Sequence, residues 1–262
     1  MYSDYTLAYG THATPDEGRC AMEWVSHLAG EPHSDQPRCV SPVLRAVCIA
    51  LNDGLDDEAR QALRPYLSRT IGTAEDGLDS ARAWMALDWL IRDYSPCWLE
   101  AGSLAEPAAV LRSLEPVLDE RSLLHALPRL EAARSEARAA RGLGSWSAAR
   151  SVARELAWSC AGAAAWAGAR LAVGDMAGDR ARAAARVLAS DAAATAAEQA
   201  LGARAPLAGR TATRAAARGA LAPTVEQLRR SVFGLLDRML PTVSEPCPQV
   251  AAARPGLLTA SA

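Results

Sequence analysis

Apolar residues recur at helical spacing along most of the chain, and no run of alternating β-branched residues is present. Ser41 and Pro42 are a cap and first-turn pair, and the wide apolar face that follows predicts a helix over about 42–53. A strongly apolar run predicts another over about 79–99. The pattern therefore predicts an all-α fold in which short N-terminal helices pack on an alanine-rich helical bundle.

The composition changes near residue 101, after which alanine and arginine dominate. We expect an acidic helical module over 1–101, an Ala/Arg-rich bundle over 102–240, and a flexible Pro-rich tail over 241–262. The helices expected in the bundle lie near 108–126, 128–141, 147–171, 175–201 and 223–240. Pro116 and Pro128 should mark helix starts or breaks. Gly162 and Gly168, flanked by alanines, indicate helices whose backbones approach closely.

The first helix is predicted over about 15–29, with Thr14 as its cap and Pro15 in its first turn. At 3.6 residues per turn, Cys20, Glu23 and His27 would then share one face. The segment from Glu31 to Cys39 should be a loop that folds its polar residues back beside this helix.

This stretch concentrates residue types that carry chemistry, and three interpretations are open. It could bind a metal, most naturally zinc but also iron, because zinc takes Cys, His and carboxylate ligands. It could perform thiol chemistry through Cys20, or its cysteines could be buried and purely structural. The candidate ligands and acid–base groups are His12, Cys20, Glu23, His27, His33, Asp35 and Cys39.

Asp88 is a further candidate, whereas Asp56, Asp57 and His125 are expected to have structural roles. Asp88 lies within an apolar run, so we expect it to pair with an arginine or to join the site around Cys20. Asp56 and Asp57 are expected to open a short helix that stops before Pro65, because acidic residues suit a helix N-terminus. His125, on an apolar segment, is expected to be structural.

Part of the stretch resembles a group of uncharacterised actinobacterial and phage-associated proteins. The resembling pattern is C-x-M-E, L-A-G-E and S/T-D-x-P-x-C, with a histidine upstream and an Asn-Asp pair downstream. It falls here on Cys20, Met22, Glu23, 28–31, Ser34, Asp35, Pro37 and Cys39, with His12, Asn52 and Asp53. The resemblance covers about residues 10–95 and implies no activity. It favours His12, Cys20, Glu23, Asp35 and Cys39 over His27 and His33.

Charge and composition narrow the function classes. Residues 1–102 hold 8 Arg and 16 acids, or −8, whereas the rest holds 20 Arg and 14 acids, or +6. All basic residues are arginine, and the alanine excess is typical of high-GC actinobacterial coding. The arginines alternate with acids and few aromatics accompany them, so a nucleic-acid surface is not expected. No signal peptide or apolar run of membrane-spanning length is seen, which indicates a cytoplasmic protein.

Two functions follow. The first is a metal-dependent enzyme acting on an unknown small molecule, with His12, Cys20, Cys39 and His27 as ligands and Glu23, Asp35 and Asp88 as acid–base groups. The alternative is a non-enzymatic helical protein in which the cluster is a structural staple and the arginine-rich helices bind an acidic protein partner. No phosphate loop, dinucleotide fingerprint, GxSxG or HExxH motif is present.

Overall fold

The computed structural model describes residues 5–141, 147–158, 160–171, 176–202 and 209–241. Within these ranges every regular element is a helix, which confirms the all-α prediction. All of the predicted tail except Pro241 lies outside the described residues. No helix in the described ranges is long and apolar enough to cross a membrane.

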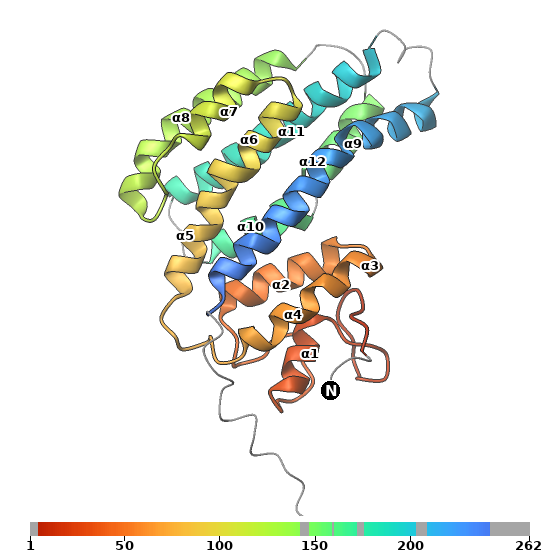
Figure 1. Ribbon diagram of the computed structural model, residues 1–262, viewed down its shortest axis with the longest axis vertical. Helices are drawn as coiled ribbons and strands as arrows, with labels where there is room; N and C mark the ends of the chain where they lie inside the picture. Colours follow the sequence, from red (N-terminus) through yellow and green to blue (C-terminus); the bar gives the residue numbers. More distant parts are fainter. Residues whose placement is uncertain (1–4, 142–146, 159, 172–175, 203–208, 242–262) are drawn as a thin grey trace, which may run out of the picture.

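The N-terminal helices gather at one end of the molecule (Figure 1). They are α1 (Ala21–Leu28), α2 (Pro42–Gly54), α3 (Asp57–Arg60), η1 (Gln61–Leu63), α4 (Arg64–Leu67) and η2 (Ser68–Thr70). The Ser41 hydroxyl accepts the Leu44 amide proton, and the Asp56 carboxylate accepts that of Ala59. These two caps confirm the predicted starts of α2 and α3.

The rest of the chain forms a bundle of helices (Figure 1). They are α5 (Asp79–Trp89), η3 (Leu90–Tyr94), α6 (Ser95–Ala101), α7 (Ala105–Arg112), α8 (Glu120–Ala140), α9 (Ser147–Ala157), α10 (Cys160–Arg170), α11 (Met176–Leu201) and α12 (Arg210–Met239). The longest of them are α8, α11 and α12. Helix α5, the π-helical η3 and α6 run on without a break, as the apolar run over 79–99 predicts. Helix α6 packs on α7 and α11, so the predicted module boundary near residue 101 falls between elements in contact.

Helix α11 is the centre of the bundle. It packs against α6, α8, α9 and α12, and its inner surface consists mainly of buried alanines. Alanine side chains let helix axes approach closely but supply little apolar area each. Gly102 shows how close the approach is, because a Cβ there would come within 2.9 Å of the Ala192 carbonyl oxygen.

Helix α10 joins the two ends of the molecule, because it packs on α2 and on α5. At Gly168 a Cβ would lie 2.8 Å from Val47 Cγ2, and at Gly162 one would lie 2.9 Å from the Tyr94 ring. The predicted close approach of helices at these glycines is therefore confirmed, and α2 is the partner at Gly168.

The prediction that Pro128 starts or breaks a helix is wrong, and so is the predicted start of the last helix near residue 223. Pro128 lies inside α8 and Pro223 inside α12, and neither ends its helix. Both prolines are on solvent-exposed faces. Water can therefore hydrogen-bond the carbonyl that each proline leaves unpaired one turn earlier. Helix α12 accordingly starts at Arg210, well before the predicted position near 223, and residues 113–119 separate α7 from α8.

The contact at Gly168 gives a stability prediction. We expect Gly168→Ala to lower the free energy of unfolding by about 1–3 kcal/mol, because Val47 is fully buried and cannot move aside. The matched control is Gly219→Ala in α12, where a Cβ meets no atom within 4 Å. There the gain in helix propensity should raise stability by roughly 0.5–1 kcal/mol. Urea unfolding measures both, and equal effects would contradict the close-contact account.

Candidate functional site

Helix α1 begins later than the sequence pattern predicts. Cys20 is its N-cap residue, and its sulfur accepts the Glu23 amide proton at 3.5 Å. The Glu23 carboxylate accepts the Cys20 amide proton at 2.8 Å, so the two residues form a capping box. The prediction of Thr14 as the cap is wrong, because the four-residue spacing Cys-x-x-Glu supplies a cap that pattern rules associate with Ser or Thr.

Glu23 is the centre of the site, with a side chain 1% exposed. Oε1 accepts the His12 amide proton at 2.6 Å, and Oε2 accepts the His12 Nδ1 proton at 2.8 Å. His33 Nε2 lies 3.9 Å from Oε1 and donates to the His12 carbonyl at 3.0 Å. We call His12, Cys20, Glu23 and His33 the Glu23 cluster.

The hydrogen bonds keep Glu23 ionised. Burial raises the pKa of Glu23, but the backbone amides of His12 and Cys20 and the His12 ring lower it by more. The pKa therefore lies below its ordinary value. A buried carboxylate of this kind is stable only while these donors stay in place.

The cluster is one of several anchors for the N-terminal segment, residues 5–19. Gln61 exchanges two hydrogen bonds with the backbone of Leu7, at 2.8 and 3.0 Å. Asn52 accepts the Ala21 amide proton and donates to the Ala8 carbonyl, both at 3.0 Å. The Asn-Asp pair in the resembling pattern thus connects the N-terminal segment, α1 and α2.

Gly18 is required by the packing of His12. Its φ is +132°, and a Cβ there would lie 3.0 Å from His12 Nε2. The backbone therefore covers the ring nitrogen that faces away from Glu23.

Cys39 is hydrogen-bonded to a second carboxylate, that of Glu31. Glu31 accepts the amide protons of Arg38 at 2.7 Å and Cys39 at 2.9 Å, and it also accepts the Cys39 thiol proton. The Cys39 carbonyl accepts from Gly72 and Ala74, so this loop is fixed to the segment before α5. Each of the two cysteines therefore has its own glutamate.

The thiols are held in the protonated form. Burial raises the pKa of Cys20 to about 12, and burial with the Glu31 hydrogen bond and charge raises that of Cys39 to about 11. Burial alone raises the pKa of Cys48 to about 12. A nucleophilic thiol needs the opposite shift.

The remaining candidates lie apart from the cluster. His27 is exposed, with its ring 5.0 Å from that of Trp24. Asp35 is half-buried in the loop after α1. Asp88 pairs with Arg92 at 3.3 Å and accepts the Val117 amide proton at 2.8 Å, which confirms the predicted arginine partner.

Within the described residues, no group of three or more His, Cys, Asp and Glu side chains is arranged to hold a metal ion. Zinc or iron binding stays a prediction. The structure places His33 beside Glu23, although the resemblance favoured Asp35 and Cys39 over His33 as site residues. Gln61 was missed as part of the site, because an uncharged amide gives no periodic or ligand signal in a sequence. Asn52 was named only through the resembling pattern, which assigned it no role.

A second feature is an arginine stripe on α12, formed by Arg210, Arg214 and Arg218. These residues are spaced four apart and are all exposed, while Thr213 and Ala217 face the interior. Arg218 pairs with the exposed Glu155 at 2.8 Å. In the part of the chain that the structure describes, neither Arg210 nor Arg214 has a carboxylate partner, so the stripe keeps a positive charge.

No family model, curated protein sequence or solved structure matches this chain.

The thiol environments give a reactivity prediction. At about pH 8 we expect Cys20 and Cys48 to react with iodoacetamide at least roughly a hundredfold more slowly in the folded protein than after unfolding in urea, because almost no thiolate is present. Cys39, less buried, should be labelled before them. Peptide mass spectrometry resolves the order. Fast labelling of Cys20 would instead support thiol catalysis.

Proposed function

We propose that this chain is a non-enzymatic helical interaction protein, that the Glu23 cluster is its structural staple, and that the arginine stripe binds an acidic protein partner. The observation that supports the proposal is the set of hydrogen bonds that the Glu23 carboxylate accepts. Its two oxygens accept three hydrogen bonds within 2.8 Å, and all three hold the segment that leads into α1. A catalytic base needs an oxygen that is free to meet a substrate.

The thiols support the staple in the same way. The Cys20 sulfur is an acceptor in the capping box, and the Cys39 thiol donates to Glu31. Both are in structural hydrogen bonds, and the pKa of each is raised. The capping box also stabilises α1, because an isolated helix of eight residues is unstable.

A metal-dependent enzyme is the second candidate, and one observation favours it. The pairing of His12 Nδ1 with Glu23 is the arrangement that commonly orients a metal-ligating histidine. His12 Nε2 and the Cys20 thiolate would be the first ligands of zinc or iron. The backbone at Gly18, which lies against Nε2, would have to move to admit the ion.

The staple gives a prediction for Glu23→Gln. The amide group cannot accept all three hydrogen bonds, so we expect the free energy of unfolding to fall by about 2–4 kcal/mol. The matched control is the exposed Glu75→Gln, which should change it by less than about 0.5 kcal/mol. Thermal and urea unfolding measure both.

The pH dependence tests the same bond network. The folded-state pKa of Glu23 is lowered, so its contribution is full above the ordinary glutamate pKa and is lost as pH falls through the folded-state value. The wild type should lose stability below about pH 4.3 more steeply than Glu23→Gln does.

A metal site would give a different result. The purified protein would contain one equivalent of zinc or iron, and its melting temperature would fall on addition of a chelator.

The partner is tested with an alanine-based helical peptide that carries glutamates at i, i+4 and i+8. We expect Arg214→Glu to weaken its binding by roughly tenfold at low ionic strength, because the substitution reverses the charge at the centre of the stripe. Arg230→Glu, on the same helix but outside the stripe, is the control. Equal affinities for the wild type and Arg214→Glu would remove the stripe as the binding surface.

A further inference from the structure

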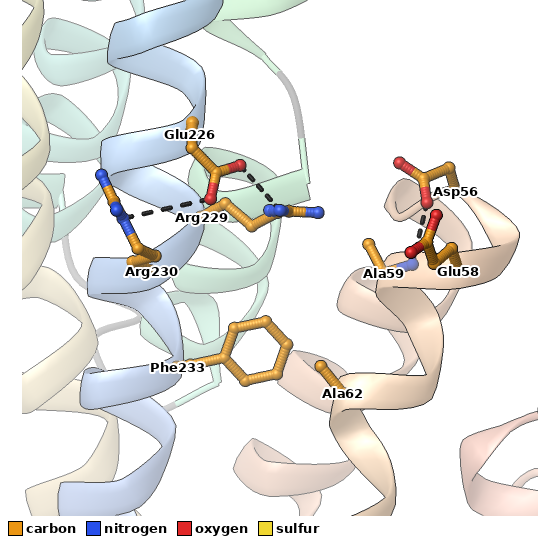
Figure 2. A pocket seen from close by; sticks show the side chains of 8 residues that line it. All are labelled: Asp56, Glu58, Ala59, Ala62, Glu226, Arg229, Arg230 and Phe233. Carbon is orange, nitrogen blue, oxygen red and sulfur yellow. Dashed lines mark hydrogen bonds and ion pairs between the residues drawn. The ribbon is translucent and has the colours of Figure 1, made fainter.

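A groove separates the N-terminal helices from α12. It encloses about 560 Å³, and its two sides come from α3 with η1 and from the C-terminal half of α12. Figure 2 shows Phe233 on α12 pointing toward Ala62 on η1 at the floor, with charged side chains above them on both sides. The Phe233 ring also packs against Tyr66, with centroids 5.6 Å apart, which fixes it in place.

The two walls carry opposite charge. On one side Asp56 and Glu58 are exposed, and one Asp56 oxygen caps α3 by accepting from Ala59. On the other side Arg229 extends from α12 toward that wall, and the Arg230 guanidinium lies beyond Glu226, on the side of α12 away from it (Figure 2). Glu226 pairs with Arg229 at 2.7 Å but reaches Arg230 only at 4.0 Å, and the Arg230 side chain is 74% exposed.

This combination selects one kind of occupant. A purely anionic ligand would be repelled by Asp56 and Glu58, and a purely cationic one by Arg229 and Arg230. An apolar side chain would gain contact with Phe233 and Ala62 on the floor. A peptide segment supplies all three features together.

We infer that this groove binds a segment of a partner protein in which a basic and an acidic residue accompany an apolar one. The basic residue faces Asp56 and Glu58, the acidic residue pairs with the exposed Arg230 at the edge of the groove, and the apolar side chain covers Phe233. The groove is separate from the arginine stripe, so the inference goes beyond the proposed function and stands or falls independently of it.

Three displayed heptapeptide libraries test the inference. Each carries one leucine and two charged residues at varied positions: one Lys with one Glu, two Lys, or two Glu. We expect the wild-type protein to retain the mixed library at least roughly tenfold over the other two, because only mixed charge complements both walls.

Arg230→Glu makes both walls acidic and should shift the preference to the two-Lys library. Arg214→Glu, which makes the same charge change on the same helix outside the groove, should leave the preference for mixed charge intact, although it should weaken binding of the glutamate helix to the stripe by roughly tenfold. Circular dichroism and melting temperature check that each variant is folded. Equal retention of the three libraries, a preference for one sign of charge, or a mixed-charge preference that survives Arg230→Glu would overturn the inference.

Discussion

Close packing of small side chains is the constraint on which the rest of the structure depends. The chain has a single phenylalanine, and the buried faces of α10 and α11 are made largely of alanine. Each alanine buries little apolar area, so the core must gain its stability from short interhelical distances and many dispersion contacts. At Gly102, Gly162 and Gly168 the helices approach so closely that one added carbon would enter a neighbour. The helices are consequently fixed in position, and the surfaces they present are fixed with them.

The N-terminal region meets a different physical demand. Helix α1 is short and is preceded by a segment without regular structure, so neither can be stable on helical hydrogen bonds alone. Two buried or partly buried carboxylates, Glu23 and Glu31, collect the backbone amides of the flanking loops. Placing an ionised group in a low-dielectric interior is costly, and these hydrogen bonds offset the cost. Because every oxygen of the two carboxylates already accepts a hydrogen bond from the chain, we interpret the Glu23 cluster as a structural staple.

Periodicity and caps predicted most of the helices. The Ser41–Pro42 start and the acidic start of α3 could be read from local sequence, because each depends on residues within four positions. An arginine partner for Asp88 was expected from its apolar surroundings, and the structure identifies it as Arg92. The positions of Pro128 and Pro223 inside helices could not be predicted from local sequence. A proline is tolerated within a helix where the carbonyl left unpaired one turn earlier faces water, and tertiary packing decides which carbonyls face water.

The candidate site was predicted in composition but not in arrangement. Cys20, Glu23 and His12 lie together as expected. The late start of α1 places Cys20 outside the helix, so the face shared with His27 does not form. Cys39 lies with Glu31, which the spacing of cysteines and histidines could not indicate. The hydrogen bonds of Asn52 and Gln61 to the N-terminal segment could not be predicted, because they depend on the folded position of a segment that is distant in the sequence.

The charged side chains near the C-terminal half of α12 are partly paired within the fold and partly exposed. At the C-terminal end of α12 the fold uses arginines of the first part: Arg69 pairs with Asp237, and the buried Arg82 pairs with Asp76 and donates to the Met239 carbonyl. Farther along the same helix the two walls are held apart by the groove, and there Glu58 and Arg230 remain exposed to solvent. A partner segment that carries both signs of charge would pair with both walls of the groove at once.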